Sequence, residues 1–258
     1  MLSLCSLSSG SKGNCIYIAS DTTEILVDFG MSYAYVQDAL QKIGTDVKNI
    51  SGVVVTHEHA DHVCGLLRAS QEGLKVYAHA RTTLAINAKC GRIQTENLPF
   101  YDGGFAIGDI TVLPFRVPHD AVYPLAYSFL EGGDKISVAT DIGHPTEGII
   151  NNLKNSRILL LEANHDREML LGGDYPERLK KRIDGANGHL SNETAAEILK
   201  RVISPKTKQI VLGHLSENNN TPELAFQTIV DSLSREGIVE GRDVLVDVAT
   251  QSHLTRIF

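Results

Sequence analysis

Several kinds of residue are scarce in this sequence, and each scarcity argues against a class of protein. The 258 residues include no tryptophan and only four cysteines, at positions 5, 15, 64 and 90. These cysteines show no C-x-x-C spacing, so we expect reduced thiols in a cytoplasmic protein and not a disulfide framework. No apolar run approaches the length of a membrane span, so we expect no membrane partner.

Positive charge is scarce as well. Lysine and arginine total 24 against 31 aspartates and glutamates, which gives a formal net charge of -7 at pH 7. We therefore do not expect a broad electrostatic hold on nucleic acid, although a local basic patch is compatible with this charge. Apolar residues make up 42% and charged residues 21%, ordinary values for a soluble globular protein.

The sequence does contain a regular order of short strands and helices. We expect strands at 2–7, 15–20, 24–28, 50–55 and 74–78, with helices at 33–43 and 81–89. A β-rich middle follows, at 105–107, 110–117, 122–130 and 135–139, before β-α alternation resumes with strands at 157–161 and 209–213. Residues 243–248 and 254–258 can close the second sheet. Since no linker divides the chain, we expect one domain over residues 1–258.

Potential metal ligands are concentrated in one stretch, Thr56-His57-Glu58-His59-Ala60-Asp61-His62. It follows an apolar run expected to be a buried strand and precedes residues expected to begin a helix. His57 and His59 are two residues apart in an extended segment and share one face, whereas Asp61 and His62 lie past the turn. One short segment can therefore contribute to two metal sites, provided that other loops complete each shell.

The pattern H-x-H-x-D-H after a hydrophobic strand resembles the signature of the metallo-β-lactamase-fold hydrolases. The resemblance implies three further ligands, and candidates occur in order near the ends of expected strands, namely His119, Asp141 and His214. It implies a first metal held by His57, His59 and His119, and a second held by Asp61, His62, Asp141 and His214. The implied fold is α/β, a four-layer αββα sandwich of two mixed sheets covered by helices, which the expected order of elements matches.

Such a centre would hold two divalent metal ions, with zinc or manganese expected and iron as a further candidate. Ions about 3.5–4 Å apart can share a bridging hydroxide that acts as the nucleophile. Asp61 can ligate a metal and also accept or orient the proton of that hydroxide, which makes it a catalytic candidate.

His189 is a second catalytic candidate. It lies in Gly188-His189-Leu190-Ser191, before a helix that Ser191 is expected to cap. It resembles the extra active-site histidine of the tRNA 3′-processing branch of the family, which lies near the scissile phosphate. A surface histidine is the alternative interpretation.

Three further features bear on the substrate. Ser11, Lys12 and Asn14 belong to S-G-S-K-G-N, which fits either a hairpin loop or a contact to phosphate. His165 can line the pocket or form only local hydrogen bonds. The densest basic cluster, at residues 177–182, can engage phosphates that flank the cleavage point or form a solvated helix face.

Taken together, T-H-E-H-A-D-H, A-T-D-I-G, L-E-A-N-H-D and G-H-L-S-N-E resemble bacterial metallo-hydrolases of the WalJ/YycJ type, over nearly the whole chain. The resemblance implies a phosphodiesterase that acts on nucleic acid, with 5′-to-3′ exonuclease activity on double-stranded DNA. One rival is a thioester hydrolase of the glyoxalase II kind, which needs a cationic grip on glutathione that we cannot locate. The other is a regulatory protein without activity, which an intact ligand set disfavours. Protein partners are not indicated.

Overall fold

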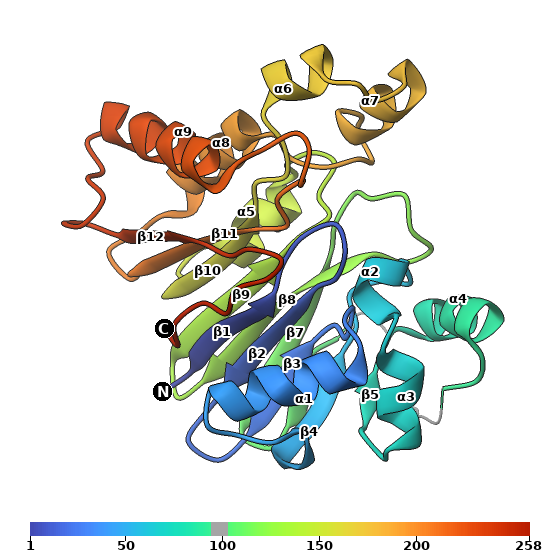
Figure 1. Ribbon diagram of the computed structural model, residues 1–258. Coiled ribbons are helices and arrows are strands. Elements are labelled where there is room, and N and C mark those ends of the chain that lie inside the picture. The colour runs from blue at the N-terminus through green and yellow to red at the C-terminus, as the bar shows by residue number, and fades with distance from the viewer. Residues whose placement is uncertain (94–102) are drawn as a thin grey trace.

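The structure, a computed structural model, describes residues 1–93 and 103–258 and arranges them in four layers (Figure 1). Two sheets face each other in the middle, and helices cover the outer face of each. This is the expected αββα sandwich. The N- and C-termini lie side by side at one end of the sheets.

The first sheet is mixed and has the strand order β1-β2-β3-β4-β5. Its first two pairings are antiparallel and the other two are parallel. Its outer face packs against α1, α3 and α4. These elements are β1 (Ser3–Ser8), β2 (Cys15–Ala19), β3 (Glu24–Val27), α1 (Tyr33–Lys42), η1 (Val47–Asn49), β4 (Ile50–Val54), α2 (Ala60–Val63), α3 (Leu66–Gln71), β5 (Val76–Tyr77) and α4 (Ala80–Cys90).

The second sheet has the order β12-β11-β10-β9-β8-β7-β6, with antiparallel pairing from β6 to β9 and parallel pairing from β9 to β12. Helices α5, α8 and α9 cover it. The strands are β6 (Phe105–Ile107), β7 (Ile110–Arg116), β8 (Leu125–Glu131), β9 (Asp134–Ala139), β10 (Ile158–Glu162), β11 (Gln209–Gly213) and β12 (Leu245–Val248). The helices are α5 (Glu147–Leu153), α6 (Arg167–Gly172), α7 (Glu177–Ile183), α8 (Asn192–Val202) and α9 (Pro222–Arg235).

The core explains why the strand segments are apolar at almost every position. In β10, Ile158 and Leu160 belong to the cluster between the sheets, whereas Leu159 and Leu161 belong to the cluster under the helices. Successive side chains of a strand point to opposite faces, so a strand buried on both faces is apolar throughout. The cluster between the sheets draws side chains from both of them. The expectation of a single domain remains a prediction.

The expectation for residues 254–258 was wrong. This segment is not a strand of the second sheet but lies beside β1 of the first. Phe258 and Leu4 exchange backbone hydrogen bonds, with the amide of Phe258 donating at 3.0 Å, and the amide of Thr255 donates to Ser6 at 3.1 Å. The aromatic ring of Phe258 packs against the cluster between the sheets. The outer edge of β1 therefore offers the segment both hydrogen bonds and apolar contact.

Two other expectations differ in detail. Strand β8 begins at Leu125 and not at residue 122, because Pro124 lacks the amide that a ladder position requires. Helices α6 and α7, at the top of Figure 1, occupy a region where we had identified only a basic cluster and assigned no helix. Asp166 caps α6 by accepting a hydrogen bond from the amide of Met169 at 2.8 Å.

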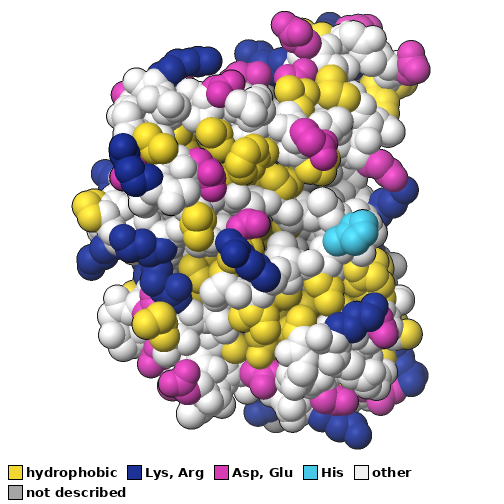
Figure 2. All heavy atoms as spheres, turned by 60° about the vertical axis from the view of Figure 1, so that its left-hand side comes forward, with side chains coloured by type: hydrophobic (Ala, Val, Ile, Leu, Met, Phe, Trp, Pro, Cys, Tyr) yellow, Lys and Arg dark blue, Asp and Glu magenta, His cyan; other side chains and the backbone are white. Residues whose placement is uncertain are grey.

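On the face that Figure 2 presents, basic and acidic side chains are interspersed with hydrophobic ones and form no continuous patch of one charge. None of the helices in the described part of the chain combines the length and the apolar character that crossing a bilayer requires.

Candidate metal centre

The histidines that follow β4 meet His119, which comes after β7 from the other sheet. The ring centroids of His57 and His59 lie 4.6 Å apart, and each lies 5.1 Å from the centroid of His119. Nε2 of His119 is 3.2 Å from Nδ1 of His59. One ring nitrogen from each lies within 4.8 Å of the others, so the three are close enough to ligate one cation together.

A second group consists of Asp61, His62 and His214. Nε2 of His62 lies 3.3 Å from Oδ2 of Asp61, and Nε2 of His214 lies 3.4 Å from the same oxygen. Asp141 stands between the groups, with Oδ2 at 3.2 Å from His62 and Oδ1 at 3.5 Å from Nε2 of His119. Its two oxygens thus face different groups, as a bridging carboxylate requires.

Backbone strain is concentrated at the ends of the strands that supply these residues. Asp28 after β3, Asp141 after β9 and His214 after β11 have left-handed backbones, with φ of 61°, 58° and 56°. Residues other than glycine seldom adopt this conformation, at a cost of about 1–3 kcal/mol each. Each strand therefore ends in a sharp turn beside the centre, and the surrounding contacts must stabilise it.

Asp28 holds His62 from behind, a role that sequence analysis did not assign. Its Oδ2 lies 2.7 Å from Nδ1 of His62 and accepts from the Thr56 hydroxyl at 2.8 Å, while Oδ1 accepts from the Thr56 amide. Burial raises the pKa of Asp28, although His62 and Thr56 act in the opposite direction. The Nδ1 contact leaves Nε2 of His62 for the centre. The available signal was an acid at the end of a buried strand, in V-D-F-G.

Glu162 does the same for two histidines at once. Oε1 accepts from Nδ1 of His189 and from Nδ1 of His214, both at 2.8 Å. Oε2 accepts from the amides of Ile142 at 2.9 Å and Leu190 at 3.0 Å. The side chain is fully buried. Burial alone would raise its pKa, but His189 and His214 outweigh burial and lower the pKa to about 2. Glu162 was noted in the sequence only as the end of a strand.

The outer nitrogens of the other ligand candidates are held too. Nδ1 of His57 lies 3.0 Å from the Thr56 hydroxyl, and Nδ1 of His119 donates to the carbonyl of Gly188 at 3.0 Å. Within the described residues, Nε2 of His57 and Oδ2 of Asp141 are buried without a hydrogen-bond partner. Unpaired buried polar atoms are rare because they cost free energy. A divalent cation would satisfy both, so the residues present fit a metal centre, and their imidazole and carboxylate donors suit zinc, manganese or iron.

The protonation equilibria agree with this fit. Burial lowers the pKa of His57 well below its usual value, so its imidazole is neutral and presents the lone pair that ligation needs. Burial would also lower the pKa of His214, but Asp141, Asp61 and Glu162 raise it to about 10. Carboxylates that favour a proton at this position also favour a metal cation in its place.

His189 stands in the wall of a cavity above the two groups. Its ring centroid is 5.1 Å from that of His119 and 5.3 Å from that of His214. The side chain is only 12% exposed, so it does not lie on the open surface. The cavity has a volume of about 220 Å³, and its wall includes His59, Asp61, Asp141, His189 and His214. Because Nδ1 is engaged by Glu162, the other ring nitrogen is left for a substrate.

The structure distributes the expected substrate residues differently. Ser11 lines the cavity, whereas Lys12 lies nearby in an exposed ion pair with Glu217. Asn14 is buried, and its amide donates to the carbonyls of Gly10 and Asp61 at 3.1 and 3.4 Å. Asn14 therefore braces the loop and the metal turn from below. Contact with substrate stays a prediction for these residues.

His165 is completely buried behind the cavity. Neither ring nitrogen has a hydrogen-bond partner among the described residues, and the nearest carboxylate oxygen, from Asp184, lies 3.6 Å from Nε2. The neighbouring residue, Asn164, lines the cavity in its place. Burial lowers the pKa of His165.

The basic cluster on α7 divides into separate parts. Lys180 is 8% exposed and its ammonium donates to the carbonyl of Leu171 at 2.8 Å, so it cannot join a surface for phosphates. Arg182 lines the cavity and pairs with Asp120 at 2.6 and 3.0 Å. Asp120 in turn lies 3.4 Å from Nε2 of His119. Arg182 is thus the member of the cluster that reaches the metal centre.

Comparisons with known proteins agree with this geometry. The model of the β-lactamase superfamily domain matches residues 23–215. The exodeoxyribonuclease WalJ of Streptococcus pneumoniae serotype 2 is 37% identical over 245 residues, covering 93% of this chain and 91% of that protein. The exodeoxyribonuclease YycJ of Bacillus anthracis is 37% identical over 238 residues, covering 91% and 90%. Among solved structures, the metallo-β-lactamase fold protein YhfI from Bacillus subtilis aligns with a TM-score of 0.72 at 16% identity, covering 98% of both chains.

The αββα layers and the histidine and aspartate groups at the strand ends are thus those of the metallo-β-lactamase superfamily, to which this chain belongs. The identity to the two curated relatives runs through nearly the whole chain. Within the superfamily, the chain is a member of the WalJ/YycJ-type subgroup.

Proposed function

We propose that this protein is a divalent-metal-dependent phosphodiesterase that acts as a 5′-to-3′ exonuclease on DNA. The observation that carries the proposal is Asp141, whose oxygens face both ligand groups at the floor of the cavity that His189 lines. The names of the two curated relatives, both exodeoxyribonucleases, support the substrate class. The proposal includes two metal ions, held by His57, His59 and His119 and by Asp61, His62, Asp141 and His214.

Cations at such a centre supply a hydroxide at neutral pH and stabilise negative charge on a phosphate. The chain's own residues do the rest. Asp61 accepts or orients the proton of the attacking water. As the water oxygen bonds to phosphorus and the ester bond breaks, the leaving oxygen takes a proton from His189. Glu162 accepts a hydrogen bond from Nδ1 of His189 at 2.8 Å and so orients the other ring nitrogen for this transfer.

The setting of the activity belongs to the same proposal. All four cysteines are free thiols, and two of them, Cys5 and Cys15, are buried. Reduced thiols are typical of the cytoplasm, and we extend the proposal to that compartment. Zinc, manganese and iron remain the candidate metals.

A substrate panel tests the proposed function. Metal-replete protein is given linear double-stranded DNA, RNA, bis(p-nitrophenyl) phosphate and a glutathione thioester. We expect release of nucleotides from the 5′ end of DNA and slower cleavage of the small diester. His189→Ala should lose most of this activity, whereas His144→Ala, which alters an exposed histidine outside the cavity lining, should keep it. Thioester hydrolysis without cleavage of any phosphodiester would overturn the proposal.

A further inference from the structure

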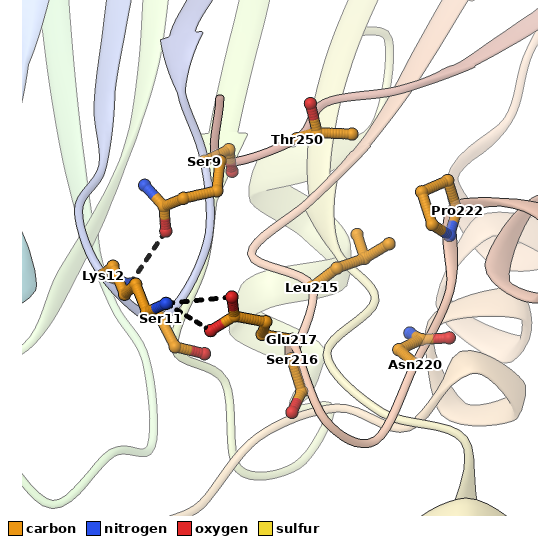
Figure 3. A pocket seen from close by; sticks show the side chains of 10 residues that line it. Ser9, Ser11, Lys12, Leu215, Ser216, Glu217, Asn220, Pro222 and Thr250 are labelled. Carbon is orange, nitrogen blue, oxygen red and sulfur yellow. Dashed lines mark hydrogen bonds and ion pairs between the residues drawn. The ribbon is translucent and has the colours of Figure 1, made fainter. Parts of the chain in front are cut away.

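A second cavity, whose lining Figure 3 shows, adjoins the one above the metal centre. Its volume is also about 220 Å³, and the two cavities share Ser11 and Ser216 in their walls. The loop after β1, the loop after β11, the first residue of α9 and the segment after β12 contribute its lining. A molecule in this cavity would therefore lie beside whatever occupies the metal centre.

The lining combines apolar and polar side chains. Leu215 and Pro222 contribute apolar side chains, and Thr250 contributes a hydroxyl (Figure 3). Ser11 and Ser216 bring two more hydroxyls at the junction with the metal cavity. Cavities of this composition suit a flat, mainly apolar group with a few polar edges, such as a base with its sugar.

An ion pair spans the cavity. The ammonium of Lys12 lies 2.9 and 2.7 Å from the two carboxylate oxygens of Glu217 (Figure 3). The side chains are 68% and 63% exposed, so the pair contributes at most about 1 kcal/mol to stability. The backbone amide of Lys12 is separately held by Oε1 of Gln251 at 2.8 Å. Lys12 is thus fixed at its backbone, while its side chain can exchange a weak carboxylate partner for a phosphate.

We propose that this second cavity binds the terminal nucleotide of a DNA strand, with the 5′-phosphate on Lys12. The inference rests on the proposed function and adds the determinant of end recognition. With the terminal base and sugar in this cavity, the next phosphate along the strand lies at the junction with the metal cavity. The centre then cleaves one nucleotide from the end, because only the terminal phosphate is a monoester, with a second negative charge that the internal diesters lack.

Opposite substitutions in the ion pair give the sharpest test. Lys12→Met removes the proposed partner of the phosphate, whereas Glu217→Gln removes the carboxylate that competes with it. Calorimetry measures the dissociation constants of a 5′-deoxynucleoside monophosphate and of the unphosphorylated deoxynucleoside with metal-replete protein. Wild type should prefer the monophosphate roughly tenfold, the preference should fall several-fold in Lys12→Met, and it should rise in Glu217→Gln.

The control is Lys48→Met, since this exposed lysine precedes β4 and so lies at the end of that strand away from the metal turn. It should leave the preference unchanged. If the ion pair serves only to hold the two loops together, both of its substitutions should act in the same direction. An equal response of Lys12→Met and Glu217→Gln, or a preference that neither alters, would overturn the inference.

Cleavage separates this inference from the proposed function. Linear DNA with a 5′-phosphate, linear DNA with a 5′-hydroxyl and closed circular DNA are compared with bis(p-nitrophenyl) phosphate. We expect Lys12→Met to raise KM several-fold for the phosphorylated end alone and to spare the small diester. Cleavage of circles as fast as linear DNA would refute the terminal subsite while leaving the phosphodiesterase intact. Binding that depends on Lys12 without cleavage of any diester would support the subsite and refute only the proposed function.

Discussion

Replacing Glu162 by glutamine tests how the metal centre is built, because the substitution keeps the shape and removes the charge. The carboxylate accepts four hydrogen bonds, from the rings of His189 and His214 and from the amides of Ile142 and Leu190. A glutamine oxygen can accept two of them. Its NH₂ group then faces the other two donors, whichever way the amide is turned.

The expected loss follows from this count. A hydrogen bond to a charged group contributes about 1.5–3 kcal/mol. Two lost bonds in a fully buried site correspond to roughly 3–5 kcal/mol of the free energy of unfolding. If the amide turns its NH₂ group to the histidines, their tautomers must change, and Nε2 of His214 is lost as a metal ligand. Affinity for the second metal should therefore fall about 10–100-fold.

Urea unfolding measures the loss in the free energy of unfolding. It is done on the metal-free protein so that metal binding does not contribute to the difference. A metal titration followed by competition with a chelator measures the second. Glu197→Gln is the matched control, since Glu197 is 65% exposed on α8 and pairs only with Lys200 in the described structure. It should change stability by less than about 1 kcal/mol. A Glu162→Gln protein as stable as this control, with unchanged metal affinity, would refute the role assigned to Glu162.

Three further predictions concern other residues in and around the metal centre. His214→Ala should lower the affinity for the second metal, and excess metal should partly offset the loss, while His189→Ala should keep both metals and lower kcat roughly 10²–10⁴-fold. Metal content and kcat, measured for each variant across a metal titration, separate these outcomes. The opposite pattern would reverse the assignment of the two histidines. Arg182→Ala should weaken DNA binding and flatten its dependence on salt. The control Lys181→Ala, from the same helix but outside the cavity lining, should change binding less. Equal effects of the two substitutions would favour the alternative interpretation of the basic cluster as a solvated helix face. Gly30→Ala should lower metal content and Tm, because a Cβ there would lie 1.7 Å from the carbonyl oxygen of Asp61. The control Gly44→Ala, where a Cβ meets nothing within 4 Å, should lower Tm only slightly. Similar losses in both variants would contradict the close packing under the metal turn.

The sequence predicted what depends on neighbours along the chain. The stretch from His57 to His62 was recognisable because four potential metal ligands fall within one strand-to-helix turn. The β-α order and the buried strands were readable from apolar runs, since a strand covered on both faces is apolar at each position. Family resemblance then gave His119, Asp141 and His214, which share no local pattern with that turn.

Contacts between distant segments could not be predicted in this way. Asp28 meets His62 and Glu162 meets His214 only after the sheets have formed. The basic cluster looked continuous, yet the turn of α7 buries Lys180 and exposes Arg182. The C-terminal segment could have paired with either sheet edge, and the choice of β1 depends on where Phe258 finds apolar contact.

Anomalous X-ray diffraction from crystals of manganese-replete protein tests directly whether the chain holds two metal ions at this centre. We expect two peaks per chain about 3.5–4 Å apart. One should lie among His57, His59 and His119, and the other among Asp61, His62 and His214, with Asp141 between them. A single peak at saturating metal, or peaks away from these residues, would rule out the proposed two-metal centre.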